Sequence, residues 1–101
     1  MENKVYDVVE GLIQKLKTTQ EENVEKTARL FADALKNGGM LQAFGSGHSQ
    51  AGASELCFRA GGFIPTKQIK EPASGAYEGI EGVGTSFMKK VDVRPNDVVV
   101  L

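Results

Sequence analysis

The stretch Met40-Leu41-Gln42-Ala43-Phe44-Gly45-Ser46-Gly47-His48-Ser49 decides the fold. Its first half is a short, mostly apolar run with glycine on both sides, which is typical of a buried strand. Its second half is a turn of glycine, serine and histidine, called the Gly/Ser turn below. The residues from Gln50 to Ala60 are compatible with a helix that Ser49 caps and that Gly61-Gly62 ends. The order strand, turn, helix indicates a parallel α/β sheet.

The segments outside this stretch fit the same fold class. Apolar residues from Val5 to Leu16 recur at steps of three and four and predict a helix, and a second apolar stripe predicts a helix that ends near Lys36. Three further segments are expected: a strand over 63–69, a short helix over 86–91 and a strand over 97–101. We therefore expect a three-layer α/β/α sandwich with a parallel sheet, in which residues 1–37 are a helical lead-in to an α/β part at 38–101.

Composition excludes several classes of function. The 101 residues carry 12 Lys and Arg against 13 Asp and Glu, so neither nucleic acid nor a membrane surface is expected as a partner. A single cysteine, Cys57, cannot form an intramolecular disulfide and is expected in the core of a cytoplasmic protein. With one histidine in the chain, we expect no metal and no cofactor.

The Gly/Ser turn is a plausible anion site. Backbone N–H groups at a helix start, glycines that allow close approach and serine hydroxyls together suit a phosphate. A nucleotide is disfavoured, because the Lys of a Walker loop is missing and no glycine stands at position 50 or 51 to complete Gly-x-Gly-x-x-Gly. The alternative is that this Gly-x-Gly is only a tight connection.

A resemblance is carried by two stretches, Phe44-Gly45-Ser46-Gly47-His48-Ser49 and Glu55-Leu56-Cys57-Phe58-Arg59-Ala60-Gly61-Gly62. They resemble the sugar isomerase (SIS) domain, most closely its uncharacterised members near phosphoheptose isomerase and N-acetylmuramic acid 6-phosphate etherase. The resemblance implies a flavodoxin-like fold whose Ser-rich loops hold the phosphate of a phosphosugar, in a homodimer or homotetramer. It also implies a second Ser/Thr-rich loop after residues 98–101, so the chain is expected to be the N-terminal part of one SIS domain.

Candidate site residues follow from the turn and its surroundings. His48 and Glu55 are the candidate catalytic residues, since imidazole titrates near neutral pH and Glu55 lies about two helical turns past Ser49. The alternatives are a polar cap for His48 and a solvated helix carboxylate for Glu55. Glu78, or Glu81 beside it, can supply a second carboxylate. The residues expected to bind the phosphosugar are Gly45, Ser46, Gly47, His48, Ser49 and Glu78.

Three functions remain open at this point. The favoured one is an aldose/ketose isomerase that moves a proton between adjacent carbons of a sugar phosphate through an enediol. An etherase-type lyase acting on an amino-sugar phosphate is the second, because Ala53-Ser54-Glu55 resembles the etherase motif with the Glu about one helical turn nearer the Gly/Ser turn. A non-catalytic phosphosugar sensor is the third.

Overall fold

A computed structural model describes residues 3–101, which divide into two compact units with the boundary between Leu30 and Phe31. The first unit contains helix α1 (Lys4–Thr19) and the beginning of helix α2 (Glu21–Lys36). Both predicted helices are confirmed, with a break at Gln20 between them. The predicted apolar stripe of α1 is 46–63% exposed: Val5, Val8, Val9, Leu12, Ile13 and Leu16. Among residues 3–101, no helix is both long enough and apolar enough to cross a membrane.

Helix α2 ends where the sequence predicts, at Asn37-Gly38-Gly39. The Gly39 N–H donates to the Ala34 carbonyl at 2.7 Å, and the Gly38 N–H donates to the Leu35 carbonyl at 3.3 Å. This pair of hydrogen bonds is the Schellman arrangement, which satisfies carbonyls that a helix end leaves free. The chain then turns directly into the first strand.

The second unit is built on a parallel sheet of three strands in the order β2-β1-β3. Strand β1 (Leu41–Phe44) lies in the centre, between β2 (Thr66–Ile69) and β3 (Val98–Val100). Ala43 of β1 is paired in register with Gln68 on one side and Val100 on the other. The predicted α/β class is therefore confirmed. Strand β2 begins three residues later than expected, because the Thr66 N–H bonds back to the Ile64 carbonyl in a turn.

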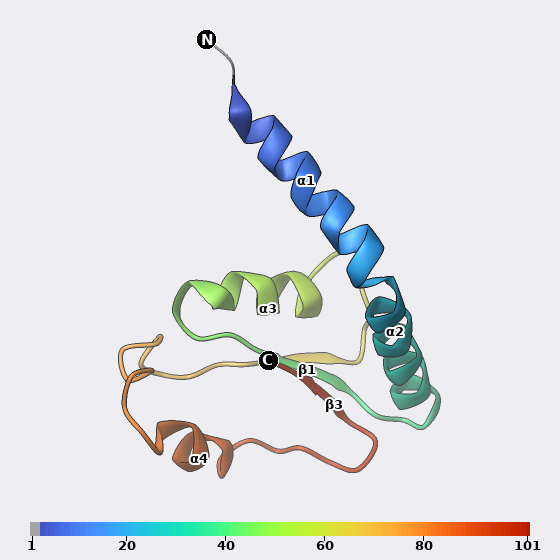
Figure 1. Ribbon diagram of the computed structural model, residues 1–101. Coiled ribbons are helices and arrows are strands. Elements are labelled where there is room, and N and C mark those ends of the chain that lie inside the picture. The colour runs from blue at the N-terminus through green and yellow to red at the C-terminus, as the bar shows by residue number, and fades with distance from the viewer. Residues whose placement is uncertain (1–2) are drawn as a thin grey trace. The chain divides into compact units, whose positions relative to one another are not determined.

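Helices cover the two faces of the sheet (Figure 1), as a three-layer sandwich requires. Successive side chains of a strand point to opposite faces. Ala43 packs under helix α3 (Gln50–Cys57) in a core cluster with Ala53 and Cys57. Phe44 faces the other way and meets Phe87 of helix α4 (Val83–Met88), with the ring centroids 5.6 Å apart.

Three predicted helix boundaries and one predicted cap are wrong. Helix α3 ends at Cys57 rather than Ala60, because the Cys57 carbonyl accepts a hydrogen bond from the Thr66 hydroxyl at 2.6 Å. Ser49 does not cap α3 with its side chain, since it already has helical backbone angles within a 3₁₀ turn at Gly47–Ser49. Helix α4 begins and ends three residues earlier than the predicted segment, with Gly82 as its N-cap.

Cys57 is a core residue, as predicted. It is buried, and this burial raises the pKa of its thiol, although hydrogen bonds from the Ala43 and Lys67 backbones act in the opposite direction. A thiol with a raised pKa is a weak nucleophile at neutral pH. The structure therefore supports a packing role.

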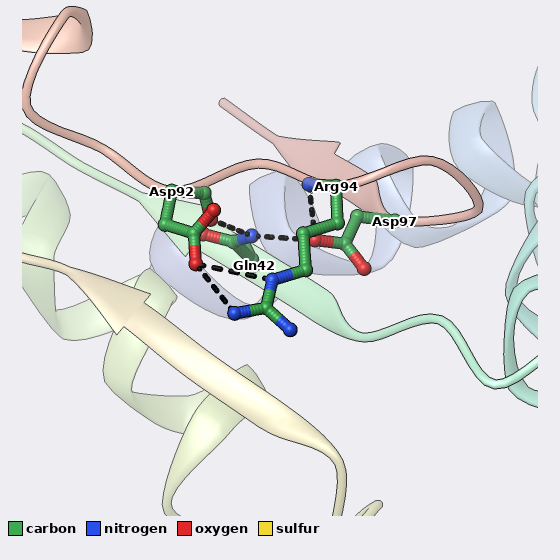
Figure 2. A network of polar contacts seen from close by, with 4 residues as sticks. All are labelled: Gln42, Asp92, Arg94 and Asp97. Carbon is green, nitrogen blue, oxygen red and sulfur yellow. Dashed lines mark hydrogen bonds and ion pairs between the residues drawn. The ribbon is translucent and has the colours of Figure 1, made fainter.

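A polar network ties the centre of β1 to the segment that leads into β3 (Figure 2). The buried Gln42 amide donates to the Asp97 carboxylate and to the Asp92 carbonyl, at 2.9 Å each. Asp97 also accepts the backbone N–H groups of Met40 and Arg94, again at 2.9 Å. These bonds, first that from Arg94 and then that from Met40, hold the pKa of the Asp97 carboxyl below its usual value. The network fixes β3 beside β1 and so shapes the edge of the sheet.

Candidate functional site

The Gly/Ser turn lies at the carboxyl end of β1, where the sheet order reverses. The chain leaves β1, forms α3 and returns as β2 on one side of it, whereas β3 lies on the other side. In open α/β sheets, ligands bind outside the carboxyl ends of the strands at such a point. The loop that follows β2, residues 70–82, starts from the same edge of the sheet. Topology alone thus brings these two loops together.

The turn itself is tightly folded. Gly45 is buried, and a side chain there would collide with the Ser49 carbonyl and the Gln50 nitrogen. The Ser49 N–H donates to the Ser46 carbonyl at 3.1 Å. Ser46 stands at the N-cap position of the 3₁₀ turn with an extended backbone, yet its hydroxyl makes no capping bond. The hydroxyls of Ser46 and Ser49 are therefore not consumed in capping the helix start.

The loop after β2 folds against the turn and is held there by Glu71. The Glu71 carboxylate accepts the backbone N–H of Ala73 at 2.6 Å and that of Gly75 at 2.8 Å. Gly75 has a φ of +87° and lies beside Gly47, where a Cβ on Gly75 would stand 2.7 Å from the Gly47 nitrogen. Position 75 requires glycine for two reasons: other residues rarely adopt this φ, and no side chain fits the space beside Gly47.

One side-chain bond joins the loop to the turn. The Ser46 hydroxyl donates to the Glu78 carboxylate at 3.0 Å. Around this bond lies a cavity of about 710 Å³, which is in the size range of small-molecule sites. Its walls come from both segments: Ser46, Gly47, His48, Ser49 and Gln50 from the turn and the start of α3, and Ala73, Ser74, Gly75, Ala76 and Glu78 from the loop.

The structure brings most of the predicted site residues together. Ser46, Gly47, His48, Ser49 and Glu78 all line this cavity. Gly45 lies beneath the turn, as a buried residue that shapes it without lining the cavity.

Glu55 is placed differently from the other predicted site residues. It is an exposed residue of α3 and does not belong to the lining of the cavity. Within the described residues, the cavity therefore combines hydroxyls, an imidazole and one carboxylate at a helix start. Such a set of groups can bind a polar, anionic ligand.

Sequence reasoning missed the residues that organise the second wall. The sequence patterns predict no role for Glu71, Ser74 or Gly75. A usable signal was present, because Glu71-Pro72 follows the strand directly and is succeeded by the small residues Ala73-Ser74-Gly75. Small residues after a strand end permit the close backbone approach that the structure shows.

Comparison with known families identifies the domain. Residues 5–101 match the family model described as the SIS domain. The chain belongs to the SIS domain family. The resemblance noted in the sequence is thereby confirmed.

The relatives of this SIS domain are longer proteins. It is 48% identical over 96 residues to a UPF0309 protein of Listeria monocytogenes, covering 95% of this chain and 41% of that protein. It is 31% identical to a UPF0309 protein of Geobacillus kaustophilus, covering 97% of this chain and 43% of the relative. A UPF0309 protein of Streptomyces avermitilis is 30% identical, with coverages of 94% and 42%. The chain thus spans about two fifths of the length of these relatives.

Proposed function

We propose that this SIS domain binds a phosphosugar in the cavity between the Gly/Ser turn and the loop after β2. The observation that carries the proposal is the convergence of Ser46, Ser49 and the start of α3 on one cavity at the reversal point of the sheet. A phosphate there would accept hydrogen bonds from the hydroxyls and gain from the helix dipole. The sugar hydroxyls would bond to His48 and to Glu78.

Binding is tested with a panel of aldose and ketose phosphates and the same sugars without phosphate. Isothermal titration calorimetry on the native chain, Ser46→Ala and Ser49→Ala is compared with Ser86→Ala, a serine of α4 outside this cavity. Each site variant should lose about tenfold in affinity for a sugar phosphate, because one hydrogen bond to a charged acceptor is removed. Equal affinity for phosphorylated and unphosphorylated sugars would refute the proposal.

The proposed reaction is aldose/ketose isomerisation. A base removes a proton from the carbon beside the carbonyl, an enediol forms, and the proton is delivered to the neighbouring carbon. His48, which lines the cavity, and Glu55 on α3 are the proposed proton-transfer residues. Glu55→Gln should retain sugar-phosphate affinity and lose turnover, as followed by NMR of the two sugar isomers. An etherase reaction would instead release lactate from the lactyl ether of an amino-sugar phosphate. Measuring lactate in the same variants therefore distinguishes the two reactions.

One observation favours a second candidate, a phosphosugar sensor without catalysis. Glu55 is exposed and lies outside the lining of the cavity, so the carboxylate expected to act as base does not face the proposed ligand position. A sensor would bind the sugar phosphate and convert none of it. Turnover by the native protein that disappears in Glu55→Gln would exclude this candidate.

We also propose that the protein is a cytoplasmic homodimer or homotetramer. The support for self-association is the apolar stripe of α1, in which Leu12 is 56% exposed and Leu16 is 60% exposed. Large exposed apolar patches mark association surfaces. Leu12→Glu/Leu16→Glu should lower the mass found by sedimentation equilibrium, whereas Lys15→Glu on the same helix should not.

A further inference from the structure

The hydroxyl that a bound phosphate would need is already in use. Ser46 Oγ donates to the Glu78 carboxylate at 3.0 Å, and both residues line the proposed phosphosugar cavity. A carboxylate and a phosphate are both anionic acceptors and compete for the same donor. An anion that binds at the turn is therefore repelled by the Glu78 carboxylate, which already accepts the hydrogen bond of the Ser46 hydroxyl.

The position of Glu78 is supported by its own loop. Glu71 holds the N–H groups of Ala73 and Gly75, and Gly75 lies against the backbone of Gly47. These contacts attach the loop to the turn three residues before Glu78. A Cβ on Gly47 would stand 3.6 Å from Glu78 Oε2, so the carboxylate reaches over the turn and not only toward the Ser46 side chain. The arrangement places the negative charge in the lining of the proposed anion site, next to Ser46 and Gly47.

The cavity offers little charge to offset this carboxylate. Among its lining residues in the described part of the chain, Glu78 is the only acid, and neither Lys nor Arg is present. Apart from the His48 imidazole, the site therefore offers an anion only hydroxyls and backbone N–H groups, against the repulsion from Glu78. The affinity for a bare anion is lowered accordingly.

We infer that Glu78 is a built-in competitor that makes the anion site selective for ligands carrying hydroxyl donors beside the phosphate. The phosphate displaces Glu78 from Ser46, and the freed carboxylate then accepts a hydrogen bond from a hydroxyl of the ligand. Inorganic phosphate must displace Glu78 as well, but it has no hydroxyl beyond the phosphate group itself that could reach the freed carboxylate, whereas a sugar phosphate has several. The inference rests on the proposed function, and it states which phosphorylated ligands the same site prefers.

The test compares the full chain with Glu78→Gln and with a matched control, Glu81→Gln. Glutamine keeps the length of the side chain and an acceptor for Ser46 but removes the charge. Glu81 is an exposed carboxylate of the same loop that lies outside this cavity. The probes are inorganic phosphate and a hexose 6-phosphate, titrated calorimetrically at low ionic strength.

We expect Glu78→Gln to bind inorganic phosphate about three- to tenfold more tightly than the native chain, since a like charge is removed at short range. The preference for hexose 6-phosphate over inorganic phosphate should shrink by a similar factor. Glu81→Gln should match the native chain. Because Glu78 is exposed, the substitution leaves the core intact, and Glu78→Ala gives a second measurement of the same gain.

The outcomes separate this inference from the proposed function. If the native chain binds hexose 6-phosphate and Glu78→Gln gains no affinity for inorganic phosphate, the competitor is refuted and the binding function stands. If Glu81→Gln gains as much affinity for inorganic phosphate as Glu78→Gln, the gain comes from the lower net charge of the protein. The role of Glu78 as a competitor is then also refuted. If none of the proteins binds either probe, both the function and the inference fail.

Discussion

Gly75 lies directly against Gly47, so that a Cβ on Gly75 would stand 2.7 Å from the Gly47 nitrogen and 3.1 Å from the Ser46 hydroxyl oxygen. Two loops that follow different strands are therefore in backbone contact at the candidate site. Their contact depends on the absence of a side chain at a single position. The shape of the cavity follows from this contact, because residues on both sides of it form the walls.

Gly75→Ala should open the site. The new methyl group meets backbone atoms, which cannot move aside as a flexible side chain would, and the φ of +87° is unfavourable for alanine. We expect a loss of about 1–3 kcal/mol in the free energy of unfolding together with a loss of sugar-phosphate binding. Urea denaturation and calorimetric titration measure the two effects.

Gly79→Ala is the matched control for this substitution. Gly79 belongs to the same loop, and a Cβ there meets nothing within 4 Å. Its stability and affinity should equal those of the native chain. A Gly75→Ala protein as stable as Gly79→Ala, with native affinity, would show that the contact does not shape the site.

Asp97→Asn should remove a pH-dependent part of the stability. The pKa of Asp97 is held below its ordinary value of 3.8, chiefly by the N–H groups of Arg94 and Met40. A carboxyl whose pKa is lowered by folding contributes stability that is present above the pKa of the unfolded chain and is lost as the pH falls through the lowered value. The stability gap between native and Asp97→Asn should thus be constant from pH 7 to about pH 5 and narrow below pH 4.

Urea denaturation at several pH values measures this gap. Asp92→Asn is the control, because Asp92 lies in the same network but pairs with Arg94 at the exposed surface. Exposed ion pairs contribute little, so this control should show a small gap at every pH. A gap for Asp97→Asn that does not change with pH would contradict the assignment.

Gln42→Glu should convert the attractive contact between Gln42 and Asp97 into a repulsive one. The Gln42 amide is buried and donates to the Asp97 carboxylate at 2.9 Å, so a glutamate would place a second carboxylate at that distance. We expect a loss of about 3 kcal/mol at pH 7, because a buried charge is left without a partner. Lowering the pH toward 5 should restore part of the loss as the new glutamate is protonated.

Gln68→Glu on the neighbouring strand serves as the comparison for Gln42→Glu. Gln68 is also buried, but its side-chain oxygen accepts a hydrogen bond from the Ser54 hydroxyl, which a carboxylate can accept equally. Its loss at pH 7 should be smaller. Equal losses for the two variants would mean that burial of the charge alone, and not Asp97, decides the effect.

Prediction from sequence succeeded where the signal is local. The apolar period of residues 5–16, the glycine stop after Lys36 and the apolar run of residues 41–44 each reflect neighbours along the chain, and the corresponding elements formed. Boundaries were less predictable, both where a local turn sets them, as at the start of β2, and where a residue of another element contributes. Helix α3 ends early because Thr66, nine residues away, takes the carbonyl of Cys57.

The same distinction applies to the candidate site. Ser46 and Ser49 were predicted from a contiguous turn, and both line the cavity. The role of Glu71 is not predictable from the sequence pattern, because the backbone N–H groups that it accepts become its donors only once the loop is folded. Glu55 was selected from helical spacing along α3, but spacing does not reveal which way the helix faces relative to the second loop.

Glu71 should govern the order of the loop without touching the ligand. Its carboxylate accepts two backbone N–H groups, so Glu71→Ala leaves both without their acceptor and Glu71→Gln keeps one amide oxygen. We expect amide hydrogen exchange at Gly75 to accelerate about tenfold in Glu71→Ala and less in Glu71→Gln, with sugar-phosphate affinity falling in the same order. Glu81→Ala, in the same loop, should alter neither quantity. If Gly75 exchange were unchanged in Glu71→Ala while affinity fell, Glu71 would be acting on the ligand through its charge, and its role as the anchor of the loop would be refuted.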